Sequence, residues 1–264
     1  MLRLLFLGDI VGEPGRKAVT DIVPRWKEER SIDFVVVNGE NSANGRGITP
    51  KICTDLLRAK VAVITSGDHI WDQKDIVPHL DMEPRLLRPI NYPPATPGRG
   101  SIVLDTPKGK VAVINVQGRT FMQPPLENPF IAMQEEVERL RHETPVIFVD
   151  MHAETTSEKI AMGRFLDGRV SALVGTHTHT QTADEQIFPG GTAFLCDAGM
   201  CGPAMSCLGR EVDPIIKKFL TGRPIQYPVA SGPVRLCGAM IEIDEQTGKA
   251  LRIERVSEMY YEQR

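Results

Sequence analysis

The chain has 264 residues with a formal net charge of −3 at pH 7, and 41% of its residues are hydrophobic. This composition is that of an ordinary globular protein, and the charge balance offers no basic excess for duplex nucleic acid. No apolar run reaches the roughly 18 residues that a membrane helix needs. The five cysteines are odd in number and lack Cys-x-x-Cys spacing, which argues against a disulfide framework and predicts a reducing, cytoplasmic location.

Apolar runs of strand length alternate with segments of helical spacing along most of the chain. In chain order we predict a strand at 2–8, a helix at 14–29, a strand at 33–39, a helix at 49–60, a strand at 61–67, a hairpin over 101–116, a helix at 128–143, a strand at 145–150, a helix at 157–168, strands at 171–176 and 191–197, and a final hairpin from 234–244 and 251–261. Thr49 and Pro50 are typical of a helix N-cap and first turn. Buried strands alternating with helices predict an α/β fold, built on a mixed sheet or on two stacked sheets.

We expect a single domain over residues 1–264. Residues 198–233 are the exception to the alternation, because this stretch is rich in Gly, Pro and Met. We interpret it as an irregular excursion or a small cap rather than sheet, with one short helix near 211–220.

Residues with metal-binding side chains follow five of the predicted strands. They are Asp9, Glu40 with Asn41, Asp68 with His69, His152, and His177 with His179. Taken singly, each has an ordinary interpretation as a helix cap, a turn former or a surface residue. In α/β sheets, however, functional sites form outside the carboxyl ends of the strands, where these side chains would meet. The joint pattern therefore favours a metal site.

The spacing of His177 and His179 extends this interpretation. In an extended chain, positions i and i+2 face the same side, so both imidazoles could reach one site, one at each of two neighbouring ions. The potential ligands are Asp9, Glu40, Asn41, Asp68, His152, His177 and His179. This set exceeds the four to six ligands of a single transition metal, which predicts two metals with a bridging carboxylate. Nitrogen and oxygen donors without thiolate favour Fe, Mn or Zn over Ca or Mg.

Two metals about 3.5–4 Å apart suit phosphoryl chemistry, since they ionise a water and neutralise phosphate oxygens. His69, beside Asp68, is the candidate general acid that protonates the leaving oxygen. Arg119 follows a predicted strand and is a candidate contact for the substrate phosphate, with an ordinary surface arginine as the alternative.

Five motifs together resemble the calcineurin-like metallophosphoesterases, and more closely the YmdB-like family of bacterial phosphodiesterases. They are Gly-Asp-x-Val-Gly-x-x-Gly from residue 8, "NGEN", "SGDHIWD", "DMHAE" and "GTHTHT". The segments "RPINYPPATPGRG", "TSEKIAMGRFLDGR" and "FLTGRP" extend the resemblance over nearly the whole chain. The resemblance implies two stacked mixed sheets flanked by helices, in an α-β-β-α sandwich with a small cap near the site. It also implies a di-iron or similar centre and hydrolysis of cyclic nucleotides, notably 2',3'-cyclic AMP.

Carried onto this sequence, the resemblance implies one metal held by Asp9, Glu40, Asn41 and His179, and a second held by position 68, His152 and His177, with Glu40 bridging. His69 would be the proton donor. The family reads Gly-Asn-His where this chain has Gly67-Asp68-His69. The extra negative charge of Asp68 would strengthen metal binding and weaken phosphate binding, because a carboxylate repels an anion.

The expected function is that of a dinuclear-metal phosphodiesterase that opens 2',3'-cyclic nucleotides by attack of a metal-bound hydroxide. A phosphomonoesterase on the same site, a metal-binding regulatory protein with little turnover, and a metal-dependent amidohydrolase are the alternatives. The expected partner is a small phosphodiester substrate, with no duplex nucleic acid and no membrane, and assembly into a homo-oligomer is left open.

Overall fold

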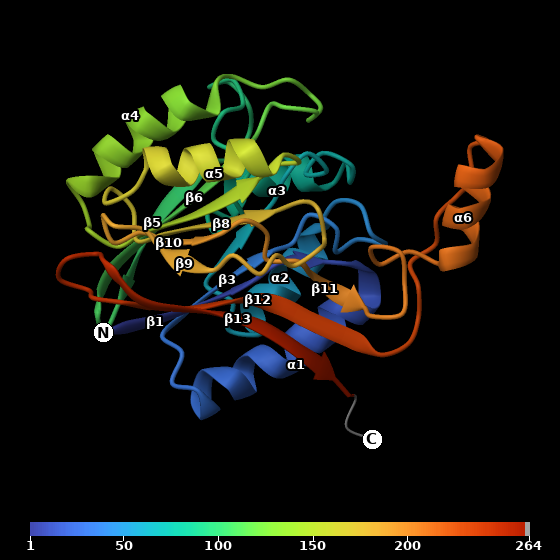
Figure 1. The fold of residues 1–264 in the computed structure, drawn as a ribbon, viewed down its shortest axis with the longest axis horizontal. Coiled ribbons are helices and arrows are strands. Elements are labelled where there is room, and N and C mark those ends of the chain that lie inside the picture. Colours follow the sequence, from blue (N-terminus) through green and yellow to red (C-terminus); the bar gives the residue numbers. More distant parts are fainter. Residues whose placement is uncertain (262–264) are drawn as a thin grey trace.

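Two β-sheets face each other in the computed structural model, which is described for residues 1–261 (Figure 1). The first sheet has seven strands in the order β2-β11-β12-β1-β3-β4, with β13 beside β12. Their bounds are Leu2–Leu7 (β1), Asp9–Ile10 (β2), Phe34–Asn38 (β3), Val63–Thr65 (β4), Met200–Pro203 (β11), Val234–Ile243 (β12) and Ala250–Tyr260 (β13).

The second sheet has six strands in the order β5-β6-β7-β8-β10-β9. Their bounds are Ser101–Thr106 (β5), Gly109–Gln117 (β6), Ile147–His152 (β7), Ala172–Thr176 (β8), Gln186–Ile187 (β9) and Ala193–Leu195 (β10). The strands β6, β7, β8 and β10 run parallel, as do β1, β3 and β4 in the first sheet. Each sheet is mixed, since β12 is antiparallel to β1 and β5 is antiparallel to β6.

Alternation along the strands explains the layers. In β1, Leu4 and Phe6 pack between the sheets, where the Phe6 ring lies 5.0 Å from that of Phe148. Leu5 and Leu7 face the other way, against the helices. Because successive strand residues point to opposite faces, an all-apolar strand such as β1 has to be covered on both sides.

Helices provide that cover. The bounds are Gly12–Glu29 (α1), Pro50–Arg58 (α2), Ile76–Met82 (α3), Pro129–Arg141 (α4), Thr156–Phe165 (α5) and Val212–Thr221 (α6). Buried side chains of α1, α2 and α3 pack on the outer face of the first sheet, and those of α4 and α5 pack on the second. As expected, Thr49 caps α2 by accepting a hydrogen bond from the Ile52 amide. The predicted α-β-β-α sandwich is confirmed.

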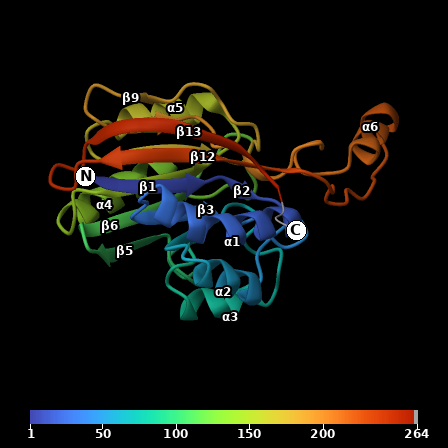
Figure 2. The ribbon, with the colours of Figure 1, turned by 90° about the horizontal axis from the view of Figure 1, so that it is seen from below.

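The segment 198–233 requires one correction. The sequence predicts no sheet there, but β11 pairs with β2 and β12 and so joins the first sheet. The short helix is confirmed as α6, which has no buried residue and projects away from the sheets in both ribbon views (Figures 1 and 2).

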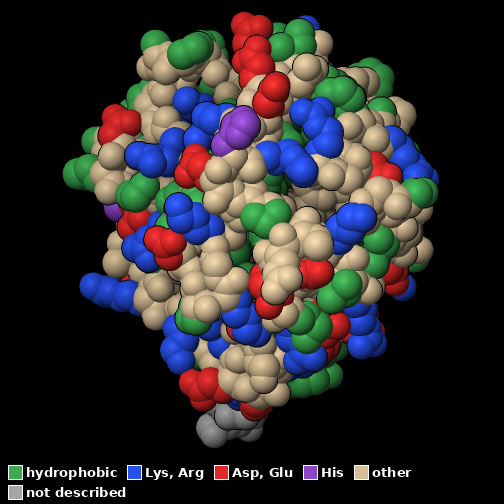
Figure 3. All heavy atoms as spheres, turned by 90° about the vertical axis from the view of Figure 1, so that its left-hand side faces the viewer, with side chains coloured by type: hydrophobic (Ala, Val, Ile, Leu, Met, Phe, Trp, Pro, Cys, Tyr) green, Lys and Arg blue, Asp and Glu red, His purple; other side chains and the backbone are tan. Residues whose placement is uncertain are grey.

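At the end of the molecule where β1 begins, basic and acidic side chains are interspersed on the surface (Figure 3). Among residues 1–261, no helix combines the length and the apolar character that crossing a membrane requires. The carboxyl ends of β1, β3 and β4 lie at the opposite end, together with those of β7 and β8.

Candidate metal centre

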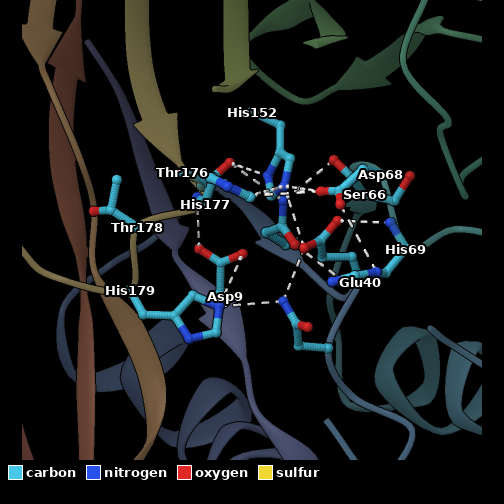
Figure 4. A network of polar contacts seen from close by, with 12 residues as sticks. Asp9, Glu40, Ser66, Asp68, His69, His152, Thr176, His177, Thr178 and His179 are labelled. Carbon is cyan, nitrogen blue, oxygen red and sulfur yellow. Dashed lines mark hydrogen bonds and ion pairs between the residues drawn. The ribbon is translucent and has the colours of Figure 1, made fainter. Parts of the chain in front are cut away.

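The strand ends of both sheets bring the predicted residues together (Figure 4). The first sheet contributes Asp9 beyond β1, Glu40 and Asn41 beyond β3, and Asp68 and His69 beyond β4, whereas the second contributes His152 at the end of β7 and His177 and His179 beyond β8. The site therefore lies where the two sheets meet. The expectation that five strand ends converge is confirmed.

Four of these residues form a tight cluster. Ligand atoms of Glu40, Asp68, His152 and His177 all lie within 4.8 Å of one another. The His152 Nε2 atom lies 3.2 Å from Glu40 Oε1 and 3.1 Å from Asp68 Oδ1. The Nδ1 atom of His177 lies 3.1 Å from the same His152 nitrogen. Two carboxylates and two imidazoles thus point at one small volume.

Asp9, Asn41 and His179 form the other half of the site. Asp9 is fully buried, and its Oδ1 atom accepts no hydrogen bond from any described residue. The His179 Nε2 atom lies 3.9 Å from that oxygen and 3.2 Å from the Asn41 amide nitrogen. Asn41 also donates a 2.8 Å hydrogen bond to Glu40 Oε1, which connects the two halves. A buried carboxylate oxygen without a partner is costly unless a cation or water satisfies it.

The three imidazoles share one arrangement. In each ring, one nitrogen bonds an oxygen outside the site, and the other nitrogen faces the carboxylates. The outer contacts are His152 Nδ1 to Thr176 Oγ1 at 2.9 Å, His177 Nε2 to Glu154 Oε2 at 3.1 Å, and His179 Nδ1 to the Leu208 carbonyl at 3.1 Å. An oxygen acceptor holds the ring N–H on the outer nitrogen, so the inner nitrogen is the one that can exchange its proton for a metal ion. This arrangement is typical of histidines that ligate metals.

The backbone from His177 to His179 differs from the prediction. It is not extended, since φ is +102° at His177 and +62° at His179. The two rings consequently point to separate halves of the site. The extended conformation that the sequence predicted for this loop was therefore wrong, and the assignment of one histidine to each of two ions stays a prediction.

Two buried carboxylates hold this strained loop. The His177 amide donates to Asp9 Oδ2 at 3.2 Å, and both the amide and hydroxyl of Thr178 donate to Asp197 Oδ2, at 3.2 and 2.8 Å. The same Asp197 oxygen pairs with Lys159 Nζ at 2.8 Å, and both side chains are almost completely buried. Left-handed backbone at non-glycine residues persists only where the surroundings fix it.

The electrostatics of the cluster favour a positive charge. Burial alone lowers the pKa of His152, but the attraction of Glu40 and hydrogen bonds to Asp68 and Glu40 outweigh it and raise that pKa well above its ordinary value. Burial raises the pKa of Asp68, yet hydrogen bonds from His152 and His177 bring it well below its usual range. Burial raises the pKa of Asp9. A site that stabilises a proton among carboxylates also stabilises a metal cation.

Behind His152, a buried polar chain fixes the ring. The Thr176 hydroxyl donates to Asp150 Oδ1 at 2.7 Å, and Asn38 Nδ2 donates to Asp150 Oδ2 at 3.0 Å. Burial raises the pKa of Asp150 to about 6. Asp150 was not among the residues predicted from the sequence, although it stands two positions before His152 on the same face of β7.

His69 lies at the edge of the cluster. Its amide donates to Glu40 Oε2 at 3.4 Å. Its Nδ1 atom lies 3.2 Å from Asp72 Oδ2 and 3.8 Å from Asp68 Oδ2, and Arg46 bonds the same Asp72 oxygen at 2.8 Å. With 26% of its side chain exposed, the ring can reach both the cluster and a ligand from solvent.

Gly67 shows how tightly the site is built. A Cβ atom at this position would lie 2.2 Å from Glu40 Oε2 and 2.3 Å from His152 Nε2. No side chain fits there, so the Gly-Asp-His turn requires glycine on steric grounds.

Arg119 is the one predicted residue that the structure does not bring into the cluster. Its backbone amide bonds Glu158 at 3.0 Å, and its side chain is exposed. No hydrogen bond or ion pair among residues 1–261 connects its guanidinium to the ligands named above. Its role in phosphate binding stays a prediction.

The donor set fits a metal centre. It offers imidazole nitrogens and carboxylate oxygens without thiolate, a buried oxygen that lacks a partner among the described residues, and anchored rings whose inner nitrogens face the carboxylates. Such donors suit Fe, Mn or Zn.

Comparison with known proteins agrees with this geometry. A family model described as "YmdB-like protein" matches residues 5–256. The protein of Bacillus subtilis (strain 168) named 2',3'-cyclic-nucleotide 2'-phosphodiesterase is 48% identical over 97% of this chain and 96% of its own length. A crystal structure of a novel phosphatase from Mycoplasma pneumoniae is 34% identical with a TM-score of 0.92, covering 98% of this chain and 93% of that chain. A crystal structure of a hypothetical protein from Thermus thermophilus is 37% identical with a TM-score of 0.91, and the match covers 98% of this chain and 99% of that chain. The resemblance seen in the motifs is confirmed, and the chain belongs to the YmdB-like family.

Proposed function

We propose that this protein is a metal-dependent hydrolase of phosphoester bonds that opens 2',3'-cyclic nucleotides. The observation that carries the proposal is the shared arrangement of His152, His177 and His179, each with one nitrogen anchored and the other facing buried carboxylates. The name of the Bacillus subtilis relative, at 48% identity, supports the substrate class.

The two halves of the site correspond to two metal positions. Asp9, Asn41 and His179 would hold one ion and Asp68, His152 and His177 the other. Glu40 would bridge them, because its Oε1 atom lies 2.8 Å from Asn41 Nδ2 and 3.2 Å from His152 Nε2. When bound, such a pair supplies an activated water and positive charge for the phosphate oxygens. Iron is our first expectation, with manganese or zinc as alternatives.

His69 supplies the proton in this proposal. Hydrolysis adds one water, breaks one P–O bond of the cyclic diester, and yields a phosphomonoester and a free ribose hydroxyl. The leaving ribose oxygen therefore needs one proton, and a partly exposed imidazole is suited to give it. The Asp72 carboxylate, 3.2 Å from Nδ1, orients the ring.

The first test measures metal content by mass spectrometry together with hydrolysis of 2',3'-cyclic AMP. About two Fe, Mn or Zn ions per chain with turnover support the proposal. In His69→Ala, we expect metal content to stay and kcat to fall by roughly 10²–10⁴-fold. His142→Ala is the matched control, since His142 is an exposed histidine at the end of α4. Full activity in His69→Ala would refute the role of His69 as proton donor. Protein that binds none of these metals after reconstitution would refute the metal centre.

The variant Asp68→Asn tests how the charge at position 68 affects metal and substrate binding. Asp68 places a carboxylate where the family resemblance implies an asparagine, so Asp68→Asn should weaken metal binding and improve KM for the anionic substrate. Unchanged metal content and kinetics would remove this special role. A phosphomonoesterase is the second candidate, favoured by the description of the Mycoplasma pneumoniae structure as a phosphatase. Release of inorganic phosphate from 3'-AMP would identify it.

A further inference from the structure

A cavity of about 390 Å³ opens beside the metal centre. Its walls include His179, Thr180, Arg235, Cys237, Arg255 and Ser257. His179 thus belongs to both the centre and the cavity wall. A substrate whose reacting phosphate lies at the centre can therefore extend into this cavity, which has the volume of a small-molecule subsite.

The floor of the cavity is the start of the β12–β13 hairpin. At the end of the sheet where the site lies, β1 makes its last pair with Gly238, whereas β12 already begins at Val234. Residues 234–237 therefore extend beyond β1. Cys237 pairs with Ser257, and its carbonyl accepts the Gly8 amide at 3.0 Å, directly before Asp9. The floor is rigid sheet, which fixes side chains precisely.

The two arginines of the cavity differ in their partners. Arg255 is neutralised by Glu185, with Nε 2.8 Å from Oε2. Arg235 is exposed, and no ion pair or side-chain hydrogen bond among the described residues involves its guanidinium. Arg235 lies on the same strand face as Cys237, two positions away. The cavity therefore presents one unneutralised positive charge beside the hydroxyls of Ser257 and Thr180.

We propose that this cavity is a subsite for a second phosphate of the substrate, bound by Arg235. The inference rests on the proposed function. A 2',3'-cyclic nucleotide has two arms that leave the ribose, the base and the 5' substituent. No Phe, Tyr or Trp lines the cavity, and its one aromatic ring, that of His179, points its Nε2 atom into the metal centre, so the usual stacking platform for a base is absent. A guanidinium with hydroxyl groups is a typical phosphate site, which selects the 5' arm.

The substrate class that follows is a ribonucleotide with a 2',3'-cyclic phosphate and a phosphate at its 5' position. That second phosphate can be terminal, as in adenosine 2',3'-cyclic phosphate 5'-phosphate, or can be the internucleotide diester of a dinucleotide ending in a cyclic phosphate. Hydrolysis adds one water and breaks the P–O2' bond, so the mononucleotide yields adenosine 3',5'-bisphosphate.

The test compares kcat/KM for three substrates on the metal-reconstituted protein. They are 2',3'-cyclic AMP, its 5'-phosphorylated form and the dinucleotide. A charge-assisted contact predicts a preference of about tenfold to a hundredfold for a substrate with the second phosphate, decreasing with ionic strength. The more reactive of the two phosphorylated substrates identifies the source of that phosphate. Equal values for all three in the wild type would overturn the subsite, whereas no hydrolysis of any of them would overturn the proposed function instead.

Arg235→Gln should bring the substrate ratio close to one, and Arg235→Lys should retain part of the preference. Arg252→Gln is the matched control, because Arg252 is 59% exposed on the same hairpin, pairs with Glu254 and does not line the cavity. Calorimetry gives an independent readout, in which adenosine 3',5'-bisphosphate binds wild-type protein more tightly than 3'-AMP does. A preference that survives in Arg235→Gln would contradict the assignment.

Discussion

The buried ion pair between Lys159 and Asp197 predicts that Lys159→Met lowers the stability of the fold. Both side chains are at most 2% exposed, and their charged atoms lie 2.8 Å apart. Removal of one partner from such a pair leaves an uncompensated charge, which costs about 3–5 kcal/mol. The Asp197 carboxylate retains the donors from Thr178 and Gly199, so we expect the lower end, about 3 kcal/mol. For a domain of this size that lowers Tm by roughly 6–12 °C.

Urea and thermal unfolding of metal-free protein measure this effect. Lys60→Met is the control, since Lys60 pairs with Glu28 at 3.0 Å but both side chains are at least 50% exposed. An exposed pair contributes less than about 1 kcal/mol. If the two variants lose the same stability, the reasoning about burial is refuted.

Thr178→Val separates the positioning of the histidine loop from global stability. It removes the 2.8 Å hydroxyl contact with Asp197 and should cost only about 1 kcal/mol in unfolding free energy. Because Thr178 stands between His177 and His179, we expect metal affinity to fall by about tenfold to a hundredfold. Unchanged metal affinity in this variant would show that the loop does not depend on the hydroxyl contact with Asp197.

Three further outcomes are expected. Removal of metal by a chelator should abolish hydrolysis. Addition of metal at about 100 times its Kd should restore roughly 2.7 kcal/mol of unfolding free energy, seen as a higher Tm. An unchanged Tm would argue against a metal site formed by the folded protein. Gly67→Ala should reduce metal occupancy below one ion per chain, because its Cβ would lie 2.2 Å from Glu40 Oε2; full occupancy would contradict the packing. Burial raises the pKa of Cys53 to about 12, so it stays a neutral thiol at pH 8, and iodoacetamide should label the partly exposed Cys207 first by mass spectrometry.

The local pattern predicted an α/β fold and the convergence of the strand ends, whereas the choice of two stacked sheets came from the family resemblance. A run such as the one in Phe34–Asn38 indicates a buried strand by its apolar side chains, and the polar residues that follow it indicate where the strand ends. The assignment of each residue to a ligand role stays a prediction.

The parts that failed depend on contacts distant in sequence. The left-handed backbone of His177 and His179 is fixed by Asp9 and Asp197, which no local spacing reveals. The sheet pairing of β11 is with Asp9–Ile10, far away along the chain, and Gly and Pro in β11 conceal it. Asp150 could have been predicted from the sequence, because a charged residue inside an apolar strand has to have a buried partner.

The position of the centre between the sheets has a consequence for the order of events during folding. Its side chains come from both sheets and from chain positions 9 to 179, and the first sheet is completed only when β12 pairs with β1. Contacts of such long sequence separation form late and slowly. During synthesis, the N-terminal strands are therefore made well before the chain can hold a metal. Metal capture thus reports the completed fold, and a pulse of metal added during refolding would mark the moment when the two sheets close on each other.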